Sequence, residues 1–288
     1  MLFVSFIMAS CNKEIFIESN SSDEKVEFSV KVKNEISIDT KVNLKESVQY
    51  LGADIKGYLV NENGETYKSF SIRNGGVYGD PIYLYDENLT LYTFWNSGQN
   101  ISDFSVIPIS ISDNIDYLYG THVIGINKRN PSAEVTLNHI LSCVKVTINN
   151  LTDRTVIVKS LSIRSKGIAK TSTFDLTSLT NDGFTGIDEY IQIINGPSLG
   201  TSYYTNSANG ETFIIPTGEA SAITIQIESE DGSITEVETP EILFEKGVKY
   251  CYTLNIKAQT VQGFTFDETN MPWKTENVDM PNNNVTGI

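Results

Sequence analysis

Few side chains in this sequence of 288 residues have the types and spacing that catalysis needs, and it contains only two histidines, His122 and His139. A serine–histidine–carboxylate triad would have to use one of them, and the one Gly-x-Ser-x-Gly match, at residues 196–200, is not followed by the amphipathic helix that a nucleophile turn needs. On a strand, His139 shares a face with Leu137 and Leu141, which predicts a buried, hydrogen-bonded structural histidine. His122 has no neighbours at metal-ligand spacing. We therefore expect no catalytic residue, no metal site and no cofactor.

Carboxylates are plentiful, and paired carboxylates for glycoside hydrolysis stay open by counting alone. The cluster at residues 228–232 reads as a solvated turn, and the carboxylate spacing of a calcium loop is absent. No Gly-Lys-Ser or Gly-Lys-Thr phosphate loop occurs. A formal net charge of −15 argues against a nucleic-acid partner, because neutralising phosphates needs a basic surface. We expect a binding or structural protein and not an enzyme.

The three cysteines fall into two groups. Cys143 and Cys251 lie in segments with a strand pattern, where a small half-buried thiol is the simplest interpretation. Two such thiols are too few for a disulfide-stapled scaffold. Cys11 instead follows an apolar run at the beginning of the sequence, so its surroundings favour a different role.

Residues 2–9 form an uncharged apolar run, much shorter than the ~20 residues of a membrane-spanning helix. The run is typical of a secretion signal, here residues 1–10. Residues 8–11 read Met-Ala-Ser-Cys and resemble the lipobox of bacterial lipoproteins, which implies that Cys11 is acylated, with palmitate among its lipids, and anchors the chain in the outer membrane. The polar residues 11–25 suit a tether. The alternative is a buried N-terminal strand that ends in a chance cysteine.

The elements that must position these residues read as strands. Apolar and polar side chains alternate along Val26–Val32, Val144–Ile148 and Val248–Ile256, and Asn-Gly or Asp-Gly turn signals separate shorter strand candidates. No amphipathic helix of ten or more residues is evident. The pattern predicts an all-β protein built from sandwiches or barrels.

The length predicts more than one domain, since single cores rarely organise so many residues. A polar, turn-rich stretch at residues 149–153 separates two strongly alternating segments. We therefore expect an N-terminal domain at 26–150 and a C-terminal domain at 151–288, with His139 inside the first.

Two motifs in the middle of the chain are more specific. Residues 116–121 read Asp-Tyr-Leu-Tyr-Gly-Thr, and residues 137–144 read Leu-Asn-His-Ile-Leu-Ser-Cys-Val. Together they resemble the fimbrillin, or Mfa-like, family of Bacteroidales surface proteins. The resemblance extends to the lipobox and to three other segments, which are Tyr92–Trp95, Tyr250–Ile256 and Pro272-Trp273. It implies two transthyretin-like β-sandwich domains in tandem and a subunit of type V pili, exported as a lipoprotein and involved in adhesion at the cell surface.

The resemblance also implies a mode of assembly. Such subunits lose an N-terminal strand to a trypsin-like protease, and a strand from a neighbouring subunit then fills the exposed groove. In this chain the removable strand is Val26–Val32, and Lys41 or Lys45 stands where the processing site is expected. The partners implied are other pilus subunits and ligands on host or bacterial surfaces. Stalk, tip and accessory positions stay open.

A carbohydrate-binding surface lipoprotein is the alternative function. Aromatic side chains offer platforms for sugar rings, although those that alternate within strands suit a core or cross-strand pairs. An exposed row of aromatics would favour this alternative. The candidates are Tyr83, Tyr85, Tyr92, Trp95, Tyr203 and Tyr204.

Overall fold

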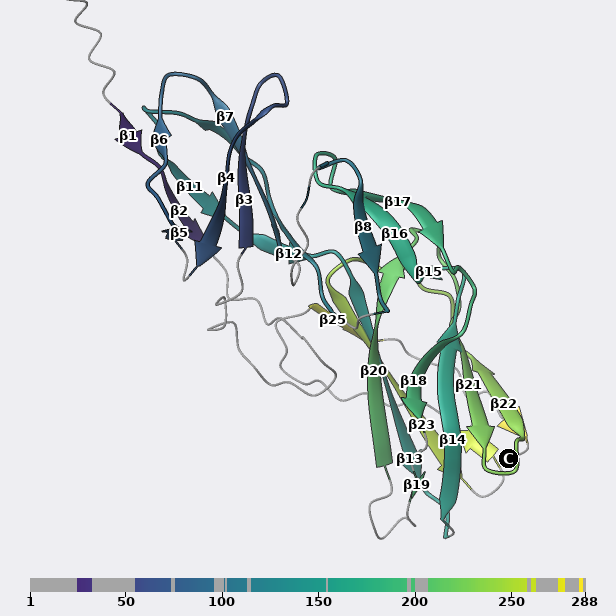
Figure 1. Ribbon diagram of the computed structural model, residues 1–288. Helices are drawn as coiled ribbons and strands as arrows, with labels where there is room; N and C mark the ends of the chain where they lie inside the picture. Colours follow the sequence, from purple (N-terminus) through teal and green to yellow (C-terminus); the bar gives the residue numbers. More distant parts are fainter. Residues whose placement is uncertain are drawn as a thin grey trace, which may run out of the picture.

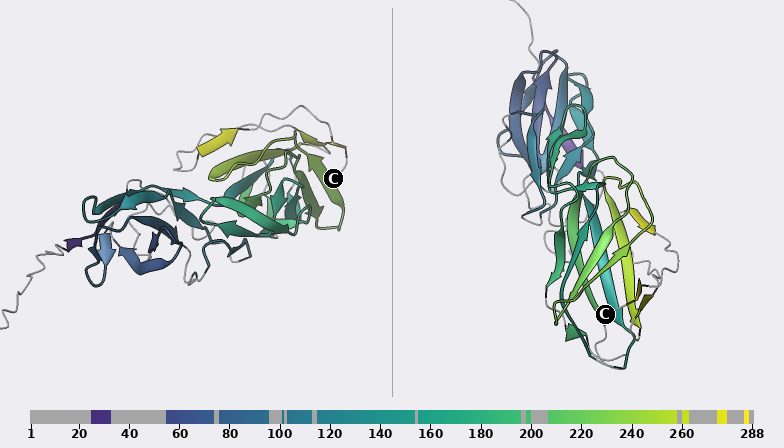
Figure 2. Two further views of the ribbon diagram at one scale, coloured as in Figure 1. Left: turned by 90° about the horizontal axis from the view of Figure 1, so that it is seen from above. Right: turned by 90° about the vertical axis from the view of Figure 1, so that its right-hand side faces the viewer.

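The computed structural model describes residues 25–32, 55–73, 76–95, 101, 103–112, 115–153, 155–195, 198–199, 207–257, 260–262, 274–277 and 285–286. Within these ranges every helix or strand assigned is a β-strand, which confirms the all-β prediction. No helix in these ranges is long and apolar enough to cross a bilayer. Figures 1 and 2 show two strand-rich lobes placed end to end.

The N-terminal lobe is built around one antiparallel sheet in the order β12-β9-β7-β3-β4-β5, with β10 also paired to β7. A smaller layer contains the parallel pair β11-β2 and the antiparallel pair β1-β6. The strands of this lobe are β1 (Val26–Glu27), β2 (Ser29–Val32), β3 (Ile55–Asn61), β4 (Thr66–Arg73), β5 (Gly76–Tyr78), β6 (Tyr83–Leu84), β7 (Leu89–Trp95), β9 (Leu118–Gly120), β10 (Val123–Ile126), β11 (Ser132–Val135) and β12 (Leu137–His139).

The C-terminal lobe contains two larger sheets, in the orders β15-β20-β13-β23-β24-β26 and β18-β14-β21-β22, with β25 paired to β23 and β19 to β14. A third sheet, β17-β16-β8, lies beside them (Figure 1). The strands of the C-terminal lobe are β8 (Ile107–Ser110), β13 (Ser142–Asn150), β14 (Val156–Arg164), β15 (Ile168–Ala169), β16 (Thr171–Asp175), β17 (Thr180–Thr185), β18 (Ile191–Asn195), β19 (Ser198–Leu199), β20 (Ser207–Pro216), β21 (Thr224–Ser229), β22 (Ile234–Glu238), β23 (Val248–Lys257), β24 (Thr260–Gln262), β25 (Lys274–Asn277) and β26 (Val285–Thr286).

Period-two alternation explains where the C-terminal core lies. Val144, Val146 and Ile148 on β13 are buried in one cluster with Leu161 and Ile163 on β14. The two strands belong to different sheets, so their inner faces pack against each other as in a sandwich. Each fully buried aliphatic side chain contributes about 1.5–3 kcal/mol.

A third cluster joins the two lobes, and we call it the junction cluster. It combines Phe94 of β7 and Ile140 from the N-terminal side with Phe174 of β16 and Phe213 of β20. The strand β8 crosses between the lobes, since it precedes β9 in the sequence but pairs with β16. The lobes therefore share both a strand connection and apolar contacts.

The strand pairing bears on the predicted division of the chain near residue 150, which itself remains a prediction. The N-terminal sheet ends at β12, whereas β13 pairs with β20 and β23, both from beyond residue 150. We therefore propose a division between His139 and Ser142. Whether each lobe is a transthyretin-like domain also remains a proposal.

Candidate functional site

The segment Val26–Val32 lies in the N-terminal lobe as two short strands. β1 pairs with β6, and β2 runs parallel to β11 from Ser29 opposite Ser132 to Val32 opposite Val135. The Phe28 amide donates to the Ile82 carbonyl at 2.8 Å. The ladder to β11 is only four residues long, and parallel pairing is slightly weaker per residue than antiparallel pairing.

Side-chain packing also holds this segment in place. Phe28 is 3% exposed and Val30 7% exposed, and both belong to the N-terminal core cluster. The Phe28 ring meets the Phe70 ring edge-on, with centroids 5.6 Å apart. Val26 and Val32 are only half-buried. Of the four alternating apolar residues, Phe28 and Val30 are therefore the two that are buried.

The residues predicted for processing and anchoring cannot be placed. Cys11, Lys41 and Lys45 lie outside the described residues, as do the signal segment 1–10 and nearly all of the tether 11–25. Lipid attachment at Cys11 and cleavage at Lys41 or Lys45 therefore remain predictions.

The two motifs from the middle of the chain meet in the structure. β9 and β12 pair in register, with His139 opposite Leu118 and Leu137 opposite Gly120. The Nδ1 atom of His139 lies 2.5 Å from a carboxylate oxygen of Asp116, which is fully buried, and His139 is 8% exposed. The other Asp116 oxygen accepts the Tyr117 amide at 2.8 Å. The prediction of a buried, hydrogen-bonded His139 is confirmed.

His122 also lies at the boundary between the lobes. Its Nε2 is 2.6 Å from the Leu176 carbonyl in the turn between β16 and β17, and its ring meets the Tyr92 ring with centroids 4.6 Å apart. Among the described residues, no group of three or more His, Cys, Asp or Glu side chains could hold a metal ion. Both histidines thus bind neighbouring protein groups.

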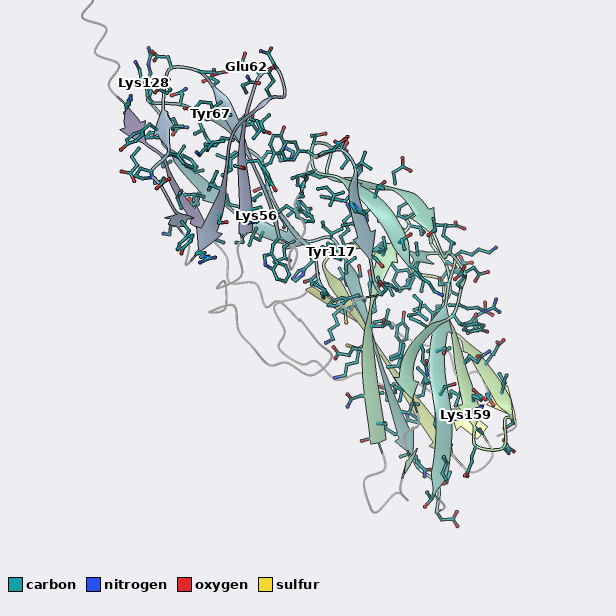
Figure 3. All side chains as sticks on the ribbon, viewed as in Figure 1. Lys56, Glu62, Tyr67, Tyr117, Lys128 and Lys159 are labelled. Atoms are coloured by element: carbon teal, nitrogen blue, oxygen red, sulfur yellow. The ribbon has the colours of Figure 1, made fainter. Side chains whose placement is uncertain are left out.

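The candidate aromatic residues are divided between core and surface. Trp95 is 3% exposed and Tyr92 is partly buried, but Tyr83 and Tyr85 are 45% and 41% exposed. Tyr67 joins them, since its hydroxyl donates to the Tyr83 carbonyl at 2.8 Å (labelled in Figure 3). Tyr203 and Tyr204 lie outside the described residues. The sequence did not single out Tyr67, because its partner strand is unknown without the fold.

A buried ionic group lies on β13, β20 and β23, on the face of these strands opposite the C-terminal core. Lys249 is 1% exposed and its ammonium donates to Glu211 at 2.8 Å, while Lys145 lies 3.8 Å from the same oxygen. The Cys143 thiol lies 3.9 Å from the other Glu211 oxygen. Burial raises the pKa of the Cys251 thiol. Its residues come from three strands that are distant in sequence, so no local sequence pattern reveals it.

Comparison with known proteins places these features in a family. A profile of fimbrillin-like proteins matches residues 21–273. No match was found among curated protein sequences.

Three solved structures, each provisionally described as a cell adhesion protein, share the fold. One from Bacteroides uniformis has a TM-score of 0.55 at 18% identity and covers 83% of this chain and 96% of its own. One from Bacteroides ovatus has a TM-score of 0.55 at 12% identity, covering 85% and 96%. One from Bacteroides fragilis has a TM-score of 0.51 at 11% identity, covering 85% and 99%.

Proposed function

The chain belongs to the fimbrillin-like family, and from this membership we propose that it is a subunit of a cell-surface pilus that assembles by strand exchange and mediates adhesion. The observation that carries the assembly step is the segment Val26–Val32. It places Phe28 and Val30 in the core, while only Ser29–Val32 pair with β11, in a short parallel ladder. The proposed role is structural and needs no enzymatic activity.

Release of this segment would open a groove with a defined chemistry. Loss of Phe28 and Val30 would expose apolar surface worth about 1.5–3 kcal/mol for each side chain. It would also free the edge of β11, which among the described strands pairs only with β2. A strand from a second subunit could restore both the backbone hydrogen bonds and the alternate apolar contacts, which is the chemistry of β-augmentation. Until then the segment covers an edge that would otherwise aggregate.

Anchoring at the outer membrane through a lipid on Cys11 is the second part of the proposal. It rests on the apolar run before Cys11 and on the Met-Ala-Ser-Cys motif. Replacing Cys11 by Ala should release the protein from membranes and abolish palmitate labelling. A variant that stays in the membrane fraction without label would contradict the anchor.

Proteolysis followed by size-exclusion chromatography tests assembly. A trypsin-like protease should cut purified protein at Lys41 or Lys45, as read by mass spectrometry, and higher oligomers should then appear. The variant with both lysines replaced by Ala should stay intact and monomeric. The control Lys159→Ala, at an exposed position, should behave as the unchanged protein. Cleavage that leaves a stable monomer would contradict strand exchange and favour a tip or accessory subunit.

A further inference from the structure

A groove on the C-terminal lobe lies apart from the segment Val26–Val32, and we propose that it binds a neutral oligosaccharide. Its volume is about 610 Å³, within the range of small-molecule sites. Four stretches of chain line it, and the groups that matter for recognition are Ser110, Ser112, Thr171, Tyr190, Gln192 and Glu211. The inference concerns a ligand site and does not depend on strand exchange.

Strands β18 and β20, which belong to different sheets, both line the groove. At Gly210 the strands are in close contact, since a Cβ there would lie 2.5 Å from Cγ1 of Ile194 and 2.9 Å from the carbonyl oxygen of Ile193. The next residues of β20, Glu211 and Thr212, already line the groove. β8 and the chain after it supply another wall. The rigid strands therefore fix the shape of the site.

Six of the eleven residues that line the groove have uncharged polar side chains. The hydroxyls of Ser110 and Ser112 lie 2.8 Å apart, and the Thr171 hydroxyl is 2.5 Å from that of Thr185. Gln192 is exposed and places an amide, with both donors and an acceptor, on β18. Sugar hydroxyls also donate and accept at once, so they match such groups in either direction.

Tyr190 supplies an aromatic ring with a fixed position. The Arg164 guanidinium lies 5.1 Å from the ring centroid, and the tyrosine hydroxyl donates to Glu236. The ring is thus held from one face and from its tip. A rigid aromatic gives a large contact area at little cost in conformational entropy, which suits the apolar face of a sugar ring.

The charges of the site select against ionic ligands. Lys170 is paired with Glu189 at 2.9 Å, and Glu211 is paired with Lys249 at 2.8 Å. The charged groups of the lining are therefore neutralised by protein partners. A chain with a net charge of −15 also repels polyanions. An uncharged polyol is the class of ligand that fits these conditions.

Affinity gel electrophoresis with embedded polysaccharides tests the proposal on the full purified chain. The probes are soluble mannan, β-glucan and galactan, with polygalacturonate as the acidic comparator. At least one neutral probe should retard the protein and polygalacturonate should not. Calorimetry with an oligosaccharide of the retarding polymer then gives a Kd. Gln192→Ala and Tyr190→Ala should each raise it about tenfold, as expected for loss of one good contact.

Matched variants separate the groove from other surfaces. Tyr190→Phe keeps the ring but loses the bond to Glu236, so it should raise the Kd less than Tyr190→Ala does. Asn88→Ala removes an exposed side-chain amide from the N-terminal lobe, outside the groove, and should have no effect, while thermal melting shows that each variant folds. Retardation by none of the neutral probes overturns the proposal. If the Tyr190→Ala/Gln192→Ala double variant still binds the polysaccharide, the proposal is wrong. Loss of binding in Tyr83→Ala also overturns the proposal, because it places the ligand on the N-terminal lobe.

Discussion

The buried pair of Asp116 and His139 links the two motifs that single out this sequence. Asp116 precedes β9 and His139 ends β12, so their contact fixes the end of the N-terminal sheet directly before β13 enters the C-terminal sheet. The Ile140 amide donates to the Tyr117 carbonyl at 2.9 Å in the same place. A polar pair at this depth helps to specify one register at the boundary between the lobes.

We predict that Asp116→Ala destabilises the protein by about 3 kcal/mol, because the substitution breaks a buried, hydrogen-bonded pair. His139→Ala should cost a similar amount, and the double variant should cost less than the sum of the two. Denaturant unfolding measures all three. The control is Asp86→Ala, which removes an exposed ion pair with Lys128 at 2.7 Å and should change stability by less than about 1 kcal/mol. An equal effect at both sites would contradict a structural role for the buried pair.

For Tyr252 we predict a substitution that does not destabilise the protein. Its ring is in the C-terminal core, and among the described residues its hydroxyl has no hydrogen-bond partner. Tyr252→Phe should therefore leave stability unchanged or raise it by about 1 kcal/mol. A clear loss of stability in chemical denaturation would mean that the hydroxyl has a partner.

The same residue makes a pH prediction. Burial raises the pKa of the Tyr252 hydroxyl above its ordinary value of 10.0. The unfolded chain then loses this proton at a lower pH than the folded chain, so the group lowers stability as pH rises above about 10. Tyr252→Phe removes that contribution. The difference in stability between variant and unchanged protein should thus grow from pH 9 to pH 11, and a constant difference would contradict the assignment.

Among the elements, β9 ends in Gly120 for a steric reason. A Cβ on Gly120 would lie 1.8 Å from the Thr93 hydroxyl and 2.6 Å from a methyl group of Val135, so β7 and β11 leave no space for it. We predict that Gly120→Ala costs at least about 2 kcal/mol through overpacking. Gly76→Ala, where a Cβ meets nothing within 4 Å, should be nearly neutral. Thermal melting of both variants and of the unchanged protein measures these effects.

A compensating change makes this test specific. Thr93→Ala removes the hydroxyl that the new methyl group would strike, so the double variant Gly120→Ala/Thr93→Ala should recover part of the loss, because neighbouring substitutions are not additive. If Gly120→Ala alone has the same melting temperature as the unchanged protein, the close contact of β7, β9 and β11 is not as described.

Alternation along the sequence was enough to predict strands but not their partners. The segments that became β2, β13 and β23 were all anticipated, since their apolar residues occur at every second position. The same alternation fits a parallel or an antiparallel neighbour in either lobe. The predicted boundary near residue 150 leaves β13 in the first domain, and alternation does not reveal its parallel pairing with β23. The groove could not be anticipated, because β18 and β20 meet only in the folded sheets.

At the scale of the whole molecule, β8 and the junction cluster connect the lobes. β8 leaves the N-terminal lobe after β7, pairs with β16, and the chain then returns to form β9. Its residues Ile107 and Ile109 are each 1% exposed within the cluster that also contains Phe94 and Phe213. An N-terminal fragment that ends near residue 140 would carry β8 without its partner strand. The lobes are therefore not independent units of stability.

We predict that the described lobes unfold together, as one calorimetric transition whose van't Hoff and calorimetric enthalpies agree. The double variant Ile107→Ala/Ile109→Ala should lower the temperature of that single transition, since each large-to-small change in a core costs about 2–5 kcal/mol. Ile124→Ala, at a position 74% exposed, should leave it nearly unchanged. Two resolved transitions in the unchanged protein would contradict the coupling.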